Sequence, residues 1–155
     1  MRFRTLALTA CALTSTEAAA LSCSFGNTAS AWHEARQFGP QFLFVRGRFD
    51  VPVAGLVFEE EAYRLTGRFS GVVIDRDGTT RPLETPIMVV GECANGDCGY
   101  LAPDSEVLTF LHRKAGRFVT YSMPCGNFPL SPEPQVAADI LSCMNAGPCE
   151  PEYDH

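Results

Sequence analysis

The segment CGYLAPDSEVLTFLHRKAGRFVTYSMPC, residues 98–125, contains two strand-like runs separated by a short turn. Val107 to His112 and Arg117 to Ser122 are rich in the branched and aromatic residues that favour β-strands. Lys114-Ala115-Gly116 lies between them and includes the glycine that tight hairpin turns favour. The segment therefore predicts an antiparallel hairpin with a cysteine at each end.

The sequence upstream adds further strands. Gln41 to Phe49 is rich in aromatic and branched residues, and Tyr63 to Ile74 alternates in character until Gly71, where the pattern breaks. A glycine inside a strand often marks a bulge or a tight bend. Pro86 to Val90 predicts one more short strand. Together with the hairpin these make five strands, which predict a small closed β-barrel or, alternatively, two packed sheets.

Two short helices are expected to flank the strands. Asn27 to Gln37 is expected to form the first, capped by Thr28 or Ser30. Pro132 to Met144 carries apolar residues at helical spacing and begins with prolines, which a first helical turn tolerates. The sequence thus predicts a mainly β domain with a short N-terminal helix and a C-terminal helix.

Residues 1–20 have the pattern of a signal peptide. Arg2 and Arg4 give a positive start, residues 6–13 form a short apolar run, and residues 18–20 supply small side chains before a cleavage site. The apolar run is far shorter than the roughly 20 residues that a membrane-spanning helix needs. We therefore expect a secreted or periplasmic protein without a transmembrane segment.

The cleavage point has two candidates. Cutting after Ala20 or after Ser22 satisfies the requirement for small residues, and only the second makes Cys23 the first residue. A third interpretation is lipidation, because ALSC, residues 20–23, loosely resembles a lipoprotein box. The three interpretations give different N-termini to the mature chain.

The cysteine count supports export. The chain contains seven cysteines, and removal of a signal peptide that includes Cys11 leaves an even number. An even number in an oxidising compartment predicts a disulfide framework, whose pairing the count alone leaves open. The spacing disfavours structural zinc, which needs two close ligand pairs, and no Cys-x-x-Cys motif indicates redox chemistry. The six cysteines expected in disulfides are Cys23, Cys93, Cys98, Cys125, Cys143 and Cys149.

Residues 23–150 have the length of a single domain, with residues 151–155 as a polar tail. The full chain has a net charge of −6, which becomes −7 when Arg2, Arg4 and Glu17 are removed. Because clustered cations are needed to neutralise phosphates, we expect such an acidic, patch-poor chain to bind neither nucleic acid nor an anionic membrane.

The sequence lacks the common catalytic motifs. It contains neither HExxH nor GxSxG, and it has no phosphate-cradling glycine loop. His33 and His112 are each expected to face solvent or to lie at the edge of the core. The sequence therefore predicts a protein that is not an enzyme, with no catalytic residues, no cofactor and no intrinsic metal site.

Residues 98–125 resemble the netrin-like module of tissue inhibitors of metalloproteinases (TIMPs) and of their bacterial relatives. Cys23, a short helix and the strand FLFVRGRF, residues 42–49, resemble the start of that module. The resemblance covers most of the chain after residue 22, and it implies a five-stranded OB-type barrel stapled by disulfides. The matching features in the first segment are, in order, Cys98-Gly99, a strand at 107–111, Gly116, a strand at 118–121 and Cys125.

The resemblance also implies that cysteines pin the N-terminal segment to the barrel. Animal inhibitors begin Cys-x-Cys, whereas this chain has Cys23-Ser24-Phe25, so one anchoring cysteine is missing and Cys93 is extra. Two arrangements remain open. They are Cys23–Cys98 with Cys93–Cys125, and Cys23–Cys125 with Cys93–Cys98, each accompanied by Cys143–Cys149.

In that family the free α-amine and carbonyl of the first cysteine chelate the zinc of a metalloprotease, and the second residue enters its specificity pocket. Cys23 and Ser24 are the corresponding partner-binding residues if cleavage follows Ser22. The resemblance thus implies an exported, non-enzymatic binding domain of the cell envelope that inhibits a metalloprotease. One alternative is an envelope module that binds oligosaccharide or protein without inhibition. Another is a hydrolase with an unrecognised site.

Overall fold

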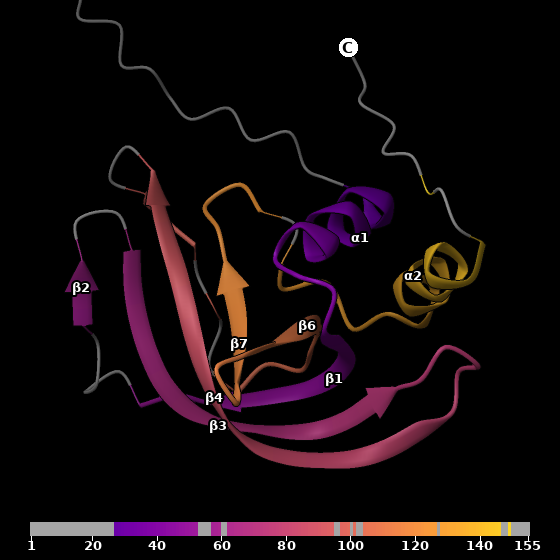
Figure 1. Cartoon of the computed structure of the whole chain (residues 1–155), viewed down its shortest axis with the longest axis horizontal. Helices are drawn as coiled ribbons and strands as arrows, with labels where there is room; N and C mark the ends of the chain where they lie inside the picture. The colour runs from indigo at the N-terminus through magenta and orange to yellow at the C-terminus, as the bar shows by residue number, and fades with distance from the viewer. Residues whose placement is uncertain are drawn as a thin grey trace, which may run out of the picture.

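The computed structural model describes residues 27–52, 57–59, 62–94, 97–99, 101, 104–126, 128–146 and 149. Within these residues the chain forms two helices and a seven-stranded sheet, with both helices beside the sheet (Figure 1). The elements are α1 (Thr28–Gln37), β1 (Phe42–Asp50), β2 (Val57–Glu59), β3 (Ala62–Ile74), β4 (Thr80–Ala94), β5 (Asp97–Cys98), β6 (Val107–Lys114), β7 (Arg117–Ser122) and α2 (Pro134–Ala146).

Five of these strands pair in a closed ring, which we call the strand ring. Its order is β3–β1–β6–β7–β4, and β4 pairs with β3 to close it. Numbered along the chain, the five strands follow the order 1-2-3-5-4 around the ring, with β4 and β7 parallel and the other neighbours antiparallel. This is the Greek-key order of an OB-type fold, so the expected mainly β architecture is confirmed.

The strand ring depends on a close crossing of β1 and β3. The predicted strand Tyr63 to Ile74 is confirmed as β3, which continues through Gly71 and pairs it with Gly47 of β1. A Cβ atom on Gly71 would lie 2.2 Å from the carbonyl oxygen of Arg46, so only glycine allows this approach. The short strand predicted at Pro86 to Val90 is the centre of a much longer strand, β4.

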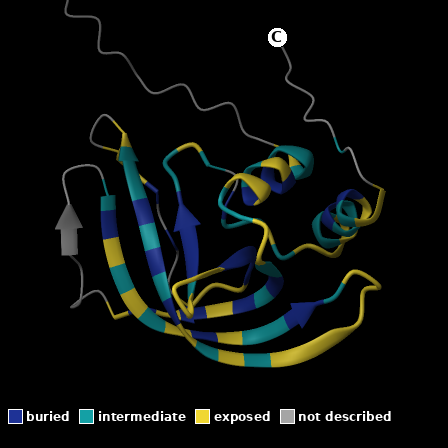
Figure 2. Ribbon diagram, viewed as in Figure 1, coloured by how far each residue is buried: buried dark blue, intermediate teal, exposed yellow. Residues whose placement is uncertain are grey.

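Two apolar clusters lie on opposite sides of the wall of the strand ring. The interior cluster comes mainly from one face of β1, β3, β4 and β6, and the second cluster lies between the outer face and the helices, whose buried sides are coloured dark blue in Figure 2. The interior cluster is Val45, Phe49, Val51, Phe69, Val73, Ile87, Val89, Leu101, Val107 and Leu111. The outer cluster is Ala31, Trp32, Ala35, Phe44, Ile74, Leu108, Phe110, Phe128, Ile140 and Cys143.

The helices cover only part of the outer face of the ring. Asn27 caps α1, because its Oδ1 accepts a hydrogen bond from the backbone N–H of Ser30 at 2.9 Å; the caps expected at Thr28 and Ser30 were wrong. α2 packs against α1 on the outer side of the strand ring. On β3 the outward residues Arg64, Thr66 and Arg68 stay exposed. The outer surface of β3 and β4 is therefore the uncovered face.

Two disulfides lie within the described residues. Cys93 and Cys98 face each other in the β4–β5 pairing with Cα atoms 3.9 Å apart, and their bond links the two strands. Cys143 and Cys149 are also bonded, at the end of α2. The Cys93–Cys98 bond belongs to the second of the two expected arrangements. Cys125 is disulfide-bonded as well.

Candidate functional site

The β6–β7 hairpin brings several cations together. Its two-residue turn is Ala115-Gly116, with φ values of 48° and 79°. Positive φ at both central positions is the geometry of the type I′ turn, whose twist suits an antiparallel hairpin. The register pairs Lys114 with Arg117, next to Arg113. A local turn preference thus places three cations at one end of the hairpin.

Two adjoining hollows lie beside this hairpin, with volumes of about 400 and about 520 Å³. Met88 of β4 and Arg117 of β7 border both hollows, so the two form one depression across β3, β4 and β7. We call this depression the hairpin groove. It is lined by Arg64, Thr66, Gly67, Thr85, Pro86, Ile87, Met88, Val90, Lys114, Ala115, Gly116, Arg117, Phe118, Val119 and Tyr121.

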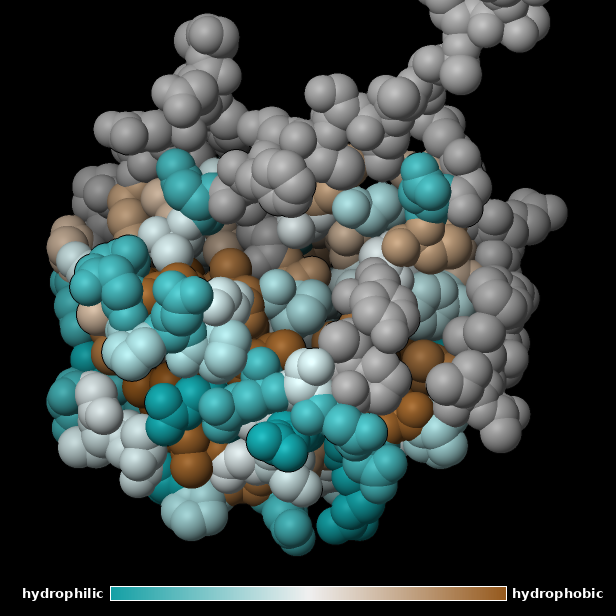
Figure 3. Space-filling view, turned by 180° about the vertical axis from the view of Figure 1, so that it is seen from behind, coloured by the Kyte–Doolittle hydropathy of each residue, from teal (hydrophilic) through white to brown (hydrophobic). Residues whose placement is uncertain are grey.

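The floor of the hairpin groove is apolar. Met88 pairs with Val119 in the parallel β4–β7 register, and Val90 pairs with Tyr121. On the rear face of the molecule, hydrophobic atoms likewise show in patches between hydrophilic side chains (Figure 3). An apolar surface with a polar margin is the pattern that binding sites commonly have.

The rim of the hairpin groove is cationic. Arg64, Lys114 and Arg117 line it, and among its described lining residues there is no Asp or Glu. Lys114 and Arg117 form no ion pair with any described carboxylate. Glu92, two residues beyond Val90 on β4, is outside the lining. The groove therefore carries positive potential on a chain whose net charge is −6.

One wall of the hairpin groove is held by stacked rings. The Nζ of Lys114 lies 5.0 Å from the ring centre of Tyr121. The same ring stacks on Phe38, just after α1, with ring centres 4.0 Å apart and an interplanar angle of 8°. Tyr121 is 8% exposed. A buried aromatic pair thus fixes the surface on which the lysine rests.

His112 corrects one sequence-based expectation. It was expected at the surface or at the edge of the core, yet only 2% of it is exposed, beneath the rings of Phe38, Phe42 and Tyr121. Neither ring nitrogen has a hydrogen-bond partner among the described residues. Burial, and secondarily the charge of Lys114, lower the pKa of His112 from 6.5 to about 4. The imidazole is therefore neutral at pH 7.

The chemistry of the groove is that of binding. Its lining residues offer cationic donors, two threonine hydroxyls and apolar contacts. In the part of the chain that is described, no group of three or more His, Cys, Asp or Glu side chains is placed to hold a metal ion. None of the described helices combines the length and the hydropathy needed to cross a membrane.

The residues predicted from the family resemblance are only partly placed. Cys23 and Ser24, the expected contact residues for a metalloprotease, lie outside the described residues. The bonded Cys93 and Cys98 lie at the β4–β5 turn, and Cys125 follows β7. These three cysteines are not in the lining of the hairpin groove.

The hairpin groove was not predicted, because this acidic chain was expected to be poor in charged patches. A signal was present: residues 107–132 contain Arg113, Lys114 and Arg117 but no acidic residue. Overall net charge hides such a local excess. Arg64 is distant in the sequence, and only the β3–β4–β7 pairing brings it to the same depression.

Comparisons of the chain with models of protein families, with curated proteins and with solved structures find no match. Function is therefore inferred from the geometry of this chain and from the resemblance in its sequence.

Proposed function

We propose that the protein is an exported, non-enzymatic binding domain of the cell envelope that holds an acidic, extended segment of a partner protein in the hairpin groove. The observation that carries this proposal is the convergence of Arg64, Lys114 and Arg117 around an apolar floor in an acidic chain. Complementary charge steers an acidic partner to such a surface and suppresses other partners.

Charge alone does not account for stable binding at this site. An exposed ion pair contributes only about 0–1 kcal/mol, because water and salt screen it. The floor formed by Met88, Val90 and Val119 adds apolar contact, which is worth about 25 cal/mol per Å² buried. We therefore expect a segment in which acidic and apolar residues alternate, since an extended chain directs successive side chains to opposite sides.

The composition of the floor supports a peptide over a glycan as the occupant. The residues that cross its centre are aliphatic. The ring of Tyr121 already contacts Phe38 and Lys114, which limits its use as a stacking platform. Aliphatic side chains of a peptide make better contact with such a floor than hydroxylated sugar rings do, because each buried hydroxyl needs a hydrogen-bond partner.

The proposal is tested by calorimetric titration of the secreted protein with a synthetic peptide that alternates glutamate and valine. The matched control peptide carries glutamine in place of each glutamate. The acidic peptide should bind, and its affinity should fall as salt is added, since the screening length is only about 10 Å at 0.1 M salt. Equal affinity for the two peptides would exclude a role for the cationic rim.

Variants locate the binding on the protein. Replacing Lys114 and Arg117 together by glutamine should lower the affinity for the acidic peptide roughly fivefold to thirtyfold, because two exposed ion pairs are lost. Arg36→Gln, on α1 and outside the groove lining, serves as the matched control with unchanged affinity. If the control variant weakens binding as much as the double variant, the groove is not the site.

Two further ligands separate this proposal from its alternatives. A neutral envelope oligosaccharide that displaces the acidic peptide would favour the glycan-binding alternative. A single-stranded oligonucleotide that binds more tightly than the peptide would overturn the expectation that the protein binds no nucleic acid. If neither the oligosaccharide nor the oligonucleotide binds, the acidic peptide remains the supported class of ligand.

Metalloprotease inhibition through Cys23 and Ser24 is a second proposal, favoured by one observation. Cys93–Cys98 and Cys143–Cys149 are paired, and Cys125 is disulfide-bonded to a residue other than these four. Loss of Cys11 with a signal peptide would leave Cys23 as the partner that pins the N-terminal segment. Mass spectrometry of the secreted chain tests this proposal, because a mature N-terminus at Leu21 would displace the chelating α-amine.

A further inference from the structure

A separate cavity of about 680 Å³ lies where α1, the start of β1, the β3–β4 turn and α2 meet. A volume of roughly 300–1,000 Å³ is typical of small-molecule sites. Its wall combines apolar side chains with two arginines, and it shares no lining residue with the hairpin groove. The residues that matter below are Trp32, Arg36, Pro40, Phe42, Arg76 and Met144.

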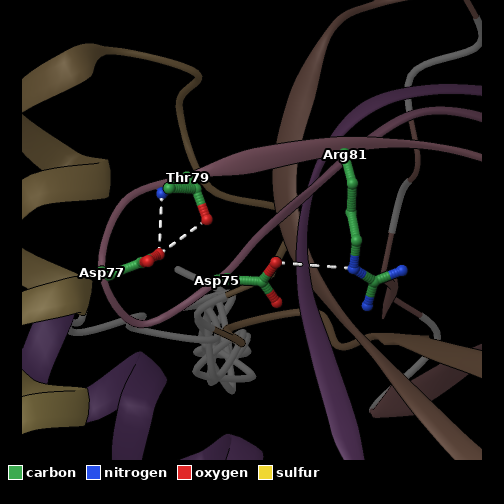
Figure 4. A network of polar contacts seen from close by, with 4 residues as sticks. All are labelled: Asp75, Asp77, Thr79 and Arg81. Carbon is green, nitrogen blue, oxygen red and sulfur yellow. Dashed lines mark hydrogen bonds and ion pairs between the residues drawn. The ribbon is translucent and has the colours of Figure 1, made fainter.

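Arg76 lies in the β3–β4 turn and lines this cavity, while the acidic residues on either side of it are held by other contacts. Asp77 accepts hydrogen bonds from the backbone N–H and the hydroxyl of Thr79, at 2.9 and 2.7 Å, and Asp75 pairs with Arg81 at 3.4 Å (Figure 4). These hydrogen bonds lower the pKa of Asp77 and keep it ionised within the turn. Arg76 has no ion pair with a described carboxylate.

The turn is fixed against α2. The side-chain amide of Asn145 donates to the carbonyl oxygen of Arg76 at 2.8 Å. On the other side, Leu141 approaches Gly78, whose φ of +81° only glycine adopts readily. Arg76 is therefore carried by a turn with contacts to a neighbouring helix, and its backbone position is defined.

Helix α1 supplies the second arginine and a buried donor. Trp32 and Arg36 lie one helical turn apart, and the guanidinium carbon of Arg36 is 6.0 Å from the centre of the indole ring. Trp32 is only 7% exposed, and its Nε1 has no hydrogen-bond partner among the described residues. This N–H has less than 1 Å² of exposed surface, so it is the indole ring, and not its N–H, that lines the cavity.

We propose that this cavity binds a small amphipathic anion, an apolar body that bears one carboxylate. Arg36 and Arg76 offer guanidinium forks that match a carboxylate, and the indole ring of Trp32 offers an apolar wall. Phe42, Pro40 and Met144 surround the apolar body. The ligand needs one carboxylate, because the two arginines belong to a single cavity and the described part of its lining contains no third cation.

The single tryptophan of the chain provides a direct readout. In the secreted protein labelled with ¹⁵N, Trp32 gives the indole N–H resonance. Phenylbutyrate, an aryl carboxylate, should shift this resonance and quench the tryptophan fluorescence in a saturable titration. Phenylbutyramide, its neutral amide, should bind about tenfold more weakly, because the charge-assisted hydrogen bonds are lost.

Variants complete the test. Arg36→Gln and Arg76→Gln should each lower the affinity for phenylbutyrate roughly threefold to tenfold. Arg117→Gln is the control and should leave this affinity unchanged, although it weakens the acidic peptide in the groove. Failure of one site leaves the other standing, since the two tests use different ligands and a variant that tests one site is the control for the other. An indole resonance that phenylbutyrate does not shift, or equal binding by the amide, would overturn the inference.

Discussion

The Nζ of Lys114 lies 5.0 Å from the ring centre of Tyr121, and the same ring contacts the buried His112 with centres 5.7 Å apart. The side chain of Tyr121 therefore contacts both Lys114, on the rim of the hairpin groove, and the buried His112. The positive charge of Lys114 helps to lower the pKa of His112, after the larger effect of burial.

Removing the charge of Lys114 should raise the pKa of His112. Lys114→Gln deletes the like charge but leaves the histidine buried, so the pKa should stay below its ordinary value. An NMR titration of the His112 ring protons in the variant and in the unaltered protein measures the change. A pKa that does not rise in Lys114→Gln would show that the lysine charge does not reach the imidazole.

Acid should destabilise the fold through His112. Its pKa is about 4 in the folded protein and 6.5 when exposed, so the unfolded chain binds the proton first as pH falls. The stability contributed by the neutral ring is present above pH 6.5 and is lost between pH 6.5 and 4, by about 3 kcal/mol in total. Urea unfolding across this pH range gives the measurement.

The control for that measurement is His112→Phe, which keeps an aromatic ring among Phe38, Phe42 and Tyr121. The variant should lose most of the acid-induced drop in unfolding free energy, because no group at this position titrates. An equal drop in the variant would place the pH dependence elsewhere.

The close crossing of β1 and β3 should be intolerant of any side chain. Gly71→Ala would bring a Cβ within 2.2 Å of a backbone oxygen and 2.6 Å of the Cα of Gly47, and should cost roughly 1–3 kcal/mol or more. Gly116→Ala is the comparison, because its Cβ would meet nothing within 4 Å and only the positive φ opposes it. Thermal unfolding should show the larger loss for Gly71→Ala.

Peptide mapping of the non-reduced secreted protein should recover two defined pairs. We expect Cys93 linked to Cys98 and Cys143 linked to Cys149. Our proposal adds Cys125 linked to Cys23. A peptide that joins Cys93 to Cys125 would contradict the bond between Cys93 and Cys98 across the β4–β5 pair.

The hairpin at 107–122 and both helices were predictable from local patterns, because strand propensity, a glycine turn and helical spacing act over short stretches. The length of β4 was not. The first half of β4, from Thr80 to Pro86, is mostly polar and contains two prolines. Only its pairing with β3 makes it a strand.

The candidate site was harder to predict than the fold. Lys114 and Arg117 are close in sequence, but Arg64 joins them only through strand pairing. The burial of His112 likewise comes from Phe38 and the other rings that cover it, since it is the last buried residue of β6 before the exposed Arg113 and Lys114. Contacts between distant segments decide both features, and a single sequence does not display them.

The central claim, that the hairpin groove binds an acidic segment, is tested most directly by NMR mapping on the secreted protein. Addition of the alternating glutamate–valine peptide should shift the amide resonances of the Lys114–Arg117 turn and of Met88 and Val90. The Lys114→Gln/Arg117→Gln double variant should lose those shifts. Shifts confined to α1 and α2, or the same shifts with the glutamine peptide, would contradict the account.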